Sequence, residues 1–273
     1  MKKDVVCLYD EHGLSGRDWA LAGYDVYCYD LEHKNVRIQN EGLGRIIFMP
    51  WDATDARQNG ALIRRHKGRT AIVLAFPPCT DLAVSGSRHF CKKRQKDPRF
   101  QHKAMELVYT ARKIGQSLKA PYCIENPISV ISSYWRKPDY IFDPYDYGGY
   151  LPEDDEHPFY PSYIAARDAY SKKTCYWVGN GFIMPPKLPV KPEPGFSCQY
   201  KKLGGKSKKT KQIRSVSPRG ISKAIFVHNS GGSRIQARLL NVNTGRVSCR
   251  VKAKSNIVYG GCRRRREKHL LSR

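Results

Sequence analysis

The sequence contains no long apolar run and no recognisable export signal. No stretch approaches the roughly 18–20 apolar residues that a membrane-spanning helix needs. The chain opens with two lysines and then a short apolar strand, which is shorter than the apolar core of a signal peptide, and no small-residue cleavage site follows it. We therefore expect a soluble, cytoplasmic protein that makes no contact with a membrane.

Cysteine is also sparse, with nine residues in a chain of 273. No two cysteines have Cys-x-x-Cys spacing, so neither a zinc ribbon nor a thioredoxin motif is indicated. His89 lies near Cys91 in sequence, but its neighbourhood favours a solvated loop histidine over a metal ligand. We expect reduced, mostly buried thiols and no bound metal, with Cys79 as the one functional exception.

Acidic residues are scarce toward the end of the chain. The whole sequence has 49 lysines and arginines against 24 acidic residues, a net charge of +25. From Lys201 onward there are 21 basic residues and a single acidic one, Glu267. This density favours contact with nucleic acid, for which Arg263–Arg266 form the strongest cluster, and a solubilising tail is the alternative. Lys201–Lys211 is rich in Gly, Ser and Lys, which predicts a flexible loop.

The apolar pattern predicts strands that alternate with helices. With 40% hydrophobic residues, wholesale disorder is excluded. We expect strands at 5–8, 24–30, 45–49, 71–76 and 122–124, and helices at 17–22, 62–67 and 102–118. This alternation predicts an α/β fold with a mainly parallel sheet and helices on both faces. Residues 129–200 are rich in Pro, Tyr, Gly and Asp, which indicates a loop-rich region with short strands such as 175–178.

The turn after the first predicted strand contains Gly13 and Gly16, and the second strand ends near Asp30 and Glu32. Glycines allow close approach of a ligand, and a carboxylate at a strand end can bind ribose hydroxyls. The glycine spacing is GxxG and no Lys-Ser/Thr follows, so the pattern favours an adenosine ligand without a diphosphate. A purely structural turn is the alternative.

Two further motifs follow predicted buried strands. The sequence FPPCT places Cys79 directly after two prolines that stiffen the loop, and IENP places Glu125 after the strand at 122–124. Because the carboxyl ends of parallel strands meet at one edge of a sheet, Cys79 and Glu125 should face the same crevice. A cysteine and a glutamate in this arrangement indicate a nucleophile and a proton donor. A cap or a turn is the alternative for Glu125.

In order and spacing these motifs resemble the DNA (cytosine-5)-methyltransferases, and they are most similar to short methyltransferase-like proteins of phage and prophage, whose second motif reads ENP. The resemblance covers residues 4–128 well and 129–228 loosely. It implies a Rossmann-like methyltransferase fold that uses S-adenosylmethionine. It also implies a cofactor-binding and catalytic domain at 1–128, a loop-rich target-recognition and closing region at 129–228, and a basic tail at 229–273 that could be disordered.

The resemblance assigns roles to particular residues. It implies that S-adenosylmethionine contacts the first turn and the ends of the next two parallel strands, through Tyr9, Asp10, Gly13, Gly16, Asp30 (or Glu32) and Asp52. It implies that the catalytic residues are Pro78, Cys79, Glu125 and Asn126. The first turn reads YDEHGLSG where the family has FxGxGG. The nearest substitutes for the family's pair of arginines, which helps hold the cytosine, are Arg167 or Lys172-Lys173, and Ser215–Pro218 is nearest to its GNSV motif.

The function implied by this resemblance is methylation of cytosine carbon 5 in double-stranded DNA, as in restriction–modification, by a monomer in a bacterial or phage-infected cell. The reaction would proceed through a covalent Cys79 adduct on a flipped cytosine. Two alternatives stay open: a catalytically weak DNA-binding protein of the same fold, and a related enzyme that modifies a pyrimidine with a different one-carbon donor.

Overall fold

Short runs of β-branched and other apolar residues form the central strands of one sheet, whereas the edge strand at Arg37–Glu41 is polar and mostly exposed. The computed structural model describes residues 3–195, 198–204 and 207–231, so the basic cluster Arg263–Arg266 lies outside the described residues. The strands are β1 (Asp4–Leu8), β2 (Asp25–Asp30), β3 (Arg37–Glu41), β4 (Gly44–Pro50), β5 (Thr70–Ala75), β6 (Tyr122–Pro127), β7 (Tyr140–Phe142) and β8 (Thr174–Gly179).

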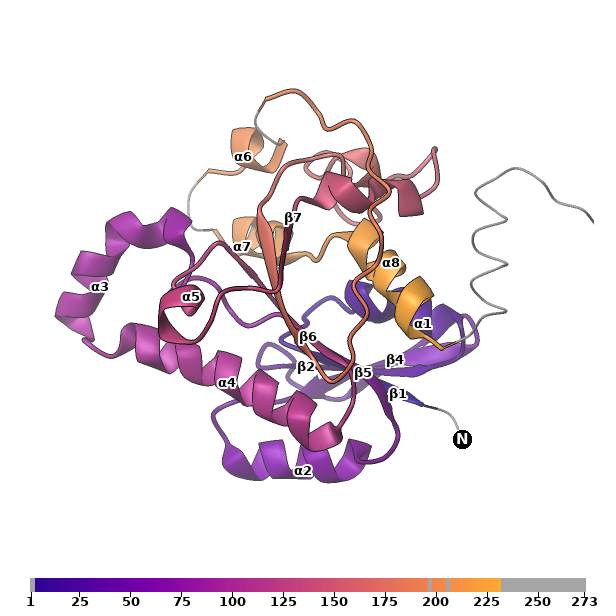
Figure 1. Ribbon diagram of the computed structural model, residues 1–273, viewed down its shortest axis with the longest axis horizontal. Helices are drawn as coiled ribbons and strands as arrows, with labels where there is room; N and C mark the ends of the chain where they lie inside the picture. Colours follow the sequence, from indigo (N-terminus) through magenta and orange to yellow (C-terminus); the bar gives the residue numbers. More distant parts are fainter. Residues whose placement is uncertain (1–2, 196–197, 205–206, 232–273) are drawn as a thin grey trace, which may run out of the picture.

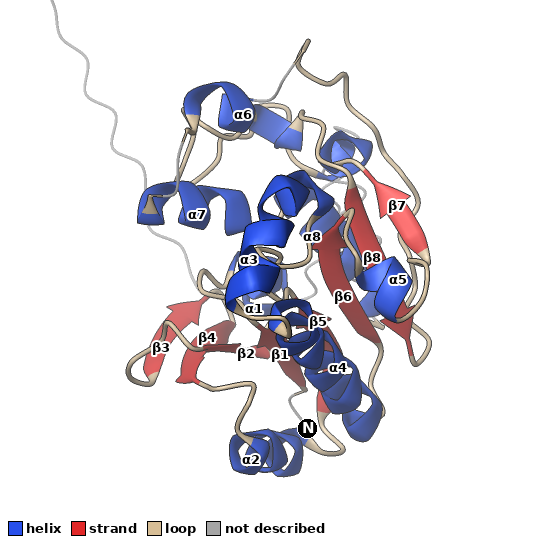
Figure 2. Cartoon of the chain, turned by 90° about the vertical axis from the view of Figure 1, so that its left-hand side faces the viewer, coloured by secondary structure: helices blue, strands red, loops and turns tan. Residues whose placement is uncertain are grey.

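The sheet is mixed but mostly parallel, as predicted. Its eight strands lie in the order β3-β4-β2-β1-β5-β6-β8-β7, seen as a row of arrows in Figure 2. β4, β2, β1, β5 and β6 are parallel, whereas β3, β8 and β7 join through antiparallel pairings. Numbered along the chain, the five parallel strands stand in the order 3-2-1-4-5, which is compatible with a Rossmann-like fold. The direction of the strand order reverses between β1 and β5. In open α/β sheets, ligands bind at this point, just outside the carboxyl ends of the strands.

Helices cover both faces of the sheet, which confirms the prediction. Figure 1 shows α2 (Ala56–His66) and α4 (Phe100–Leu118) below the sheet, and α1 (Arg17–Leu21) and α8 (Arg219–Asn229) above it. Successive residues of β1 alternate between the two layers: Val6 and Leu8 pack toward α2 and α4, and Val5 and Cys7 toward α1 and α8. All four are fully buried. Among the described helices, none is long and apolar enough to cross a membrane.

The region after β6 has few long elements, as predicted. It contains α5 (Ile131–Tyr134), α6 (Cys198–Lys202), α7 (Lys208–Ser215) and the 3₁₀ helices η3 (Pro144–Tyr150) and η4 (Ala166–Asp168). Earlier in the chain, η1 (Leu14–Gly16) follows β1, and η2 (Val84–His89) and α3 (Phe90–Lys96) follow the Cys79 loop. The short strands β7 and β8 extend the same sheet as the N-terminal strands.

The prediction of a loop throughout Lys201–Lys211 was wrong, because both ends of that segment are helical. Helices α6 and α7 both include residues from it. Leu203, Ile213 and Val216 are buried in a cluster with Leu14 of the first turn. The lysines between these positions obscured the apolar pattern in the sequence, because long charged side chains remain exposed while the backbone beneath them packs.

Candidate active site

Cys79 and Glu125 follow adjacent parallel strands. Ala75, the last residue of β5, is paired with Ile124 of β6, so the two chain segments leave the sheet side by side. Glu125 is partly buried at the end of β6, and Cys79 is exposed on the loop after β5. The predicted juxtaposition of the two motifs at one edge of the sheet therefore agrees with the structure.

Asn126 ties the two motifs together. Its side chain is 1% exposed, and its Nδ2 donates a hydrogen bond to the Pro77 carbonyl at 2.9 Å. The Cys79 carbonyl accepts bonds from the backbone amides of Leu82, at 3.0 Å, and Ala83, at 2.8 Å. The prolines restrict the backbone before Cys79, and these bonds close the turn after it. The backbone that carries the thiol is thus fixed on both sides of Cys79.

The Asn126 tether gives a first testable prediction. Asn126→Ala should lower the free energy of unfolding by about 1–3 kcal/mol, because the buried Pro77 carbonyl loses its partner. Urea denaturation followed by circular dichroism measures this change. Ser129→Ala is a matched control, since the Ser129 hydroxyl is also buried but has no hydrogen-bond partner in the described structure. An equal loss in both variants would show that Asn126 does not act through the Pro77 bond.

The surroundings raise the pKa of both groups. Desolvation raises the pKa of the Cys79 thiol, and the nearby Glu125 charge raises it further. Burial raises the pKa of the Glu125 carboxyl above its usual range. Lys172 opposes both shifts, because its positive charge favours the thiolate and the carboxylate. A glutamic acid that keeps its proton to higher pH suits a proton donor.

Lys172 reaches the site from the loop before β8. The antiparallel pairing of β8 with β6 sets Thr174 opposite Pro127, which directs the preceding loop to the end of β6. The Lys172 ammonium donates to the Arg214 carbonyl at 3.2 Å. The other candidate cations are engaged elsewhere: Lys173 pairs with Asp143 at 2.6 Å, and the Arg167 guanidinium is directed to the Gly148 carbonyl at 3.4 Å.

Asp10 builds the turn that follows β1. Its Oδ1 accepts bonds from the backbone amides of His12, at 3.0 Å, and Gly13, at 2.7 Å. This local bonding is a typical role of aspartate in turns. Gly13 has a φ of 73°, in the left-handed region that favours glycine. A Cβ at Gly16 would overlap the side chain of Val26, so Gly16 allows η1 to pack closely on β2.

The Tyr9 side chain lies away from this turn, on the α4 side of the sheet. Its hydroxyl donates to the Leu107 carbonyl of α4 at 2.8 Å, and its ring packs on Trp51 at 5.1 Å. Tyr9 has a φ of 60°, an uncommon value for a residue other than glycine, so the backbone turns sharply directly after β1. Its backbone, rather than its ring, therefore shapes the predicted cofactor turn.

Asp30 and Asp52 follow neighbouring strands, as predicted, but have different surroundings. Asp30 ends β2, where burial raises the pKa of its carboxyl, and the charges of Asp10 and Glu11 add to this effect. Its Oδ1 accepts a bond from the Glu32 amide at 2.8 Å. The Asp52 carboxylate binds within its own turn, to the amide and hydroxyl of Thr54. The structure thus groups Asp10 with Asp30, and Asp52 shapes a separate loop after β4.

Two buried cysteines lie beneath the first turn. Ligand atoms of Cys7, Asp10 and Cys28 lie within 4.8 Å of one another, and all three residues are buried. The Cys28 thiol donates to Asp10 Oδ2 at 4.0 Å. Cys123 and Cys175 are also buried, which agrees with the expected core thiols. Cys91 is exposed on α3, so the prediction of burial was wrong at that position.

The sequence did not predict that helix α7 packs over the first turn. Gln212 of α7 donates to Glu11 at 2.9 Å, and Leu14 packs in the cluster formed with α7. The apolar residues spaced through the lysine-rich segment were the available signal. The site as a whole combines a cysteine, a partly buried acid and a cation at one sheet edge. Beside it lies the first turn, which α7 covers, with a carboxylate at the end of β2. This chain matches no protein-family model and no curated protein.

Proposed function

We propose that the protein is a DNA cytosine-5 methyltransferase that uses S-adenosylmethionine. The observation that carries this proposal is the pairing of Cys79 with Glu125 on adjacent strand ends, with Asn126 bonded to the nucleophile loop. A thiol nucleophile and a protonated carboxylic acid are the two groups that addition to cytosine requires. The substrate is double-stranded DNA, consistent with the strongly basic sequence.

The cofactor side of the proposal is supported by the fold and by the donor groups present. The sheet is compatible with a Rossmann-like fold, in which the first turn and the end of the second strand can receive an adenosine. The Asp30 carboxylate is poorly solvated and lies beside other acidic groups, so hydrogen bonds from ribose hydroxyls would stabilise its negative charge. Asp52 would lie near the adenine. When bound, S-adenosylmethionine supplies the methyl group that is transferred to carbon 5.

Cys79 acts as the nucleophile in the proposed mechanism. Its thiolate adds to carbon 6 of the cytosine, forming an Sγ–C6 bond, while Glu125 donates its proton to ring nitrogen 3. This addition makes carbon 5 an enamine carbon that can accept a methyl group. Methyl transfer to carbon 5 leaves S-adenosylhomocysteine. The carbon 5 proton then passes to solvent water, the Sγ–C6 bond breaks with its electron pair on sulfur, and nitrogen 3 returns its proton to Glu125. These steps restore the aromatic ring, the Cys79 thiolate and the protonated acid. A stacked base cannot reach Cys79, so the cytosine must leave the helix.

Lys172 assists this chemistry as the cation of the site. Its charge favours the Cys79 thiolate, and we assign to it a share in holding the cytosine, the role that the resemblance gives to an arginine pair. The contacts of Lys173 and Arg167 favour Lys172 for this role over the other two candidates.

Lys172→Gln should slow alkylation of Cys79 by iodoacetamide several-fold at neutral pH. Loss of the positive charge raises the pKa of the thiol, so less thiolate is present and the pH midpoint of the reaction moves upward. Mass spectrometry of tryptic peptides measures each thiol separately, because cleavage after Arg88 separates Cys79 from Cys91.

Three comparisons make this measurement specific. Cys91 is exposed and gives an internal reference in every sample. Lys173→Gln removes a neighbouring charge that is paired with Asp143, so it should leave Cys79 reactivity unchanged. Lys172→Arg keeps the positive charge, so it should retain most of the wild-type Cys79 reactivity. If Cys79 reacts equally fast in Lys172→Gln and in the wild type, Lys172 does not influence the thiol and the assignment of Lys172 to the site is wrong.

Asp30→Ala should raise the S-adenosylmethionine concentration needed for half-maximal activity by at least about tenfold, with a smaller fall in maximal rate. Hydrogen bonds to a charged acceptor contribute about 1.5–3 kcal/mol, and ribose bonds are made equally in the ground and transition states. Steady-state kinetics with varied cofactor measures both parameters. If Glu32→Ala gives this effect and Asp30→Ala does not, the ribose assignment moves to Glu32.

Transfer of a radiolabelled methyl group from S-adenosylmethionine to duplex DNA tests the proposed activity. Label retained on purified DNA supports the enzyme. DNA binding without transfer would favour a binding protein of the same fold. Transfer that occurs only with another one-carbon donor would favour the related pyrimidine-modifying enzyme.

A further inference from the structure

Strand β3 forms one edge of the sheet and is surrounded by exposed apolar side chains. Among the described strands it pairs only with β4. Large apolar residues in and around β3 form what we call the edge patch, with exposures from 43% to 82%: Leu21, Leu31, Val36, Ile38 and Leu43. Natural proteins seldom leave an open strand edge beside apolar side chains, because another strand adds there readily.

The two faces of β3 have different surroundings. On one face Glu41 accepts hydrogen bonds from Arg17 Nε, at 2.8 Å, and from Gln39 Nε2, at 3.2 Å, so its polar groups have partners. Ile38 points to the opposite face, since side chains alternate along a strand. It lies opposite the buried Ile47 of β4, yet it is 56% exposed. In the part of the chain that the structure describes, the apolar face of β3 therefore has little cover.

The open edge of β3 also offers backbone groups to a further strand. A two-residue turn joins β3 to β4, and Glu41 pairs with Gly44 across it. In such a hairpin the closing pair is hydrogen-bonded, and bonded and non-bonded pairs then alternate along the ladder. The amide and carbonyl groups of Ile38 and Asn40 therefore point away from β4, toward the open side of the sheet.

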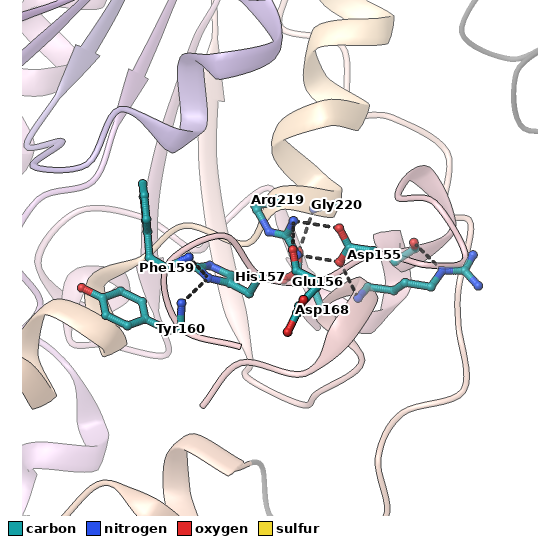
Figure 3. Close-up of polar contacts among 10 residues, drawn as sticks. Asp155, Glu156, His157, Phe159, Tyr160, Asp168, Arg219 and Gly220 are labelled. Carbon is teal, nitrogen blue, oxygen red and sulfur yellow. Dashed lines mark hydrogen bonds and ion pairs between the residues drawn. The ribbon is translucent and has the colours of Figure 1, made fainter. Parts of the chain in front are cut away.

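Helix α8 is held at both ends, which fixes the place where the chain leaves the described structure. At its start Arg219 pairs with the Asp155 carboxylate at 2.6 Å (Figure 3). At its end the Tyr24 hydroxyl donates to the Ser230 carbonyl at 3.0 Å. Between these points α8 packs beside α1, as Figure 1 shows.

The end of α8 lies close to one end of the edge patch. Tyr24, which contacts Ser230, directly follows the turn after α1. Leu21 is the last residue of α1, and its carbonyl accepts the Leu43 amide at 3.4 Å. Leu43 belongs to the turn at which β3 finishes. The chain therefore leaves α8 at the end of the sheet where β3 ends.

The sequence that follows α8 contains a pattern typical of a β-hairpin. The stretch 238–254, which lies outside the described residues, has two runs in which apolar and polar residues alternate, and the tripeptide NTG at 243–245 separates the runs. Asn and Gly are typical turn residues, so the pattern predicts two strands and a tight turn. The alternating apolar residues are Leu240, Val242, Val247, Cys249, Val251 and Ala253.

A hairpin of this kind and the β3 edge have complementary needs. An isolated two-stranded hairpin is marginally stable in water, and it gains stability from a third strand and an apolar surface. β3 offers both. Residues 232–237 can span up to about 20 Å when extended, which allows the first run to start beside the end of β3. A run that starts there lies antiparallel to β3.

The charges favour this segment over a second copy of the protein as the occupant. Residues 21–43, which carry the edge patch, include four acidic and two basic residues in a chain of net charge +25. Residues 234–254 include six basic residues and no acidic one. Opposite charges meet when this segment covers β3, whereas two copies of β3 would bring stretches of the same net charge together.

We propose that residues 238–254 dock on the edge patch as a hairpin whose first run pairs antiparallel with β3. The backbone groups of Ile38 and Asn40 bond to this run, and its apolar side chains cover Ile38 and Val36. The sheet is thereby extended beyond β3 by the chain's own C-terminal segment. This docking goes beyond the proposed function and does not depend on it.

Hydrogen–deuterium exchange of the full-length protein, resolved to single amides, tests this docking. The Ile38 and Asn40 amides should exchange slowly in the wild type and at least about tenfold faster in Val242→Pro. Proline within a strand removes a hydrogen-bond donor and disfavours pairing, so the first run is released from β3. The substitution lies outside the described fold, so amides of β4 that bond to β2 should keep their wild-type exchange rates.

Leu270→Pro is the matched control, since it places the same residue in the C-terminal segment but beyond the stretch 238–254. It should leave the exchange of Ile38 and Asn40 unchanged. Strand β7, at the opposite edge of the sheet, is an internal reference that neither proline should affect.

Three results would overturn the docking. The first is fast exchange of the Ile38 and Asn40 amides in the wild type, which would show an uncovered edge. The second is slow exchange that Val242→Pro leaves unchanged or that Leu270→Pro removes equally. The third is slow exchange that appears only as the protein concentration rises, which would show that a second copy covers β3.

Discussion

Cys79→Ser should abolish methyl transfer while DNA binding stays within a few-fold of wild type. The substitution is nearly isosteric, and the loop is held by backbone bonds and by Asn126, neither of which uses the thiol. A serine hydroxyl at this position is a far weaker nucleophile than a thiolate. Loss of a covalent nucleophile can cost up to about 10⁶-fold in rate, so we expect a fall of at least about 10³-fold. Single-turnover transfer of labelled methyl groups measures it.

The exposed Cys91 provides the control for this experiment. Cys91→Ser changes a thiol only 12 residues along the chain, on α3, and should leave methyl transfer unchanged. Wild-type protein should also form a covalent adduct with DNA that contains 5-fluorocytosine, because fluorine at carbon 5 blocks the final elimination. The adduct should map to the peptide with Cys79. Methylation by the Ser variant at the wild-type rate would exclude Cys79 as the nucleophile.

Glu125→Gln should slow methyl transfer by about 10²–10⁴-fold, the usual contribution of general acid catalysis. Glutamine preserves the shape of the side chain but cannot donate the proton that nitrogen 3 needs. At alkaline pH, where the free protein holds Glu125 ionised, the same change removes a negative charge near the thiol and so lowers the pKa of Cys79. Alkylation of Cys79 should therefore become faster as methyl transfer becomes slower.

These opposite effects separate a proton donor from a structural residue. Damage to the fold would disturb both readouts together, whereas loss of the proton donor alone leaves the thiol intact and more reactive. Rates of methyl transfer and of Cys79 alkylation should be measured on the same preparation. A Gln variant with wild-type methyl transfer, or one with slower alkylation as well, would contradict the assignment of Glu125.

The fold and the main pair of residues could be predicted because their signals are local. The apolar run at 71–76 is too continuous to be half exposed, so a buried parallel strand was expected there, and Cys79 must then emerge at its carboxyl end. The same reasoning applies to Glu125 after β6. The shared edge of a parallel sheet brings them together without any knowledge of side-chain contacts.

Other features depend on contacts between distant segments, which a sequence pattern does not contain. Lys172 and Lys173 are equivalent in sequence, and only their contacts in the fold distinguish them: Lys173 is paired with Asp143, whereas Lys172 donates to the Arg214 carbonyl. Asp10 has the appearance of a ligand-binding carboxylate, but its Oδ1 bonds the turn amides. His157 and Asp168 gave no motif, since the burial that leaves one polar atom of each without a partner in the described structure arises only in the folded chain.

Mass spectrometry of nucleosides tests the central claim most directly. Unmethylated duplex DNA would be incubated with the full-length protein and S-adenosylmethionine, digested to nucleosides and compared with the same reaction containing the Cys79→Ser variant. We predict 5-methyl-2′-deoxycytidine in the wild-type reaction and none above background in the variant. A wild-type reaction with no modified cytosine, or with the methyl group on another base or another atom, would contradict the proposed function.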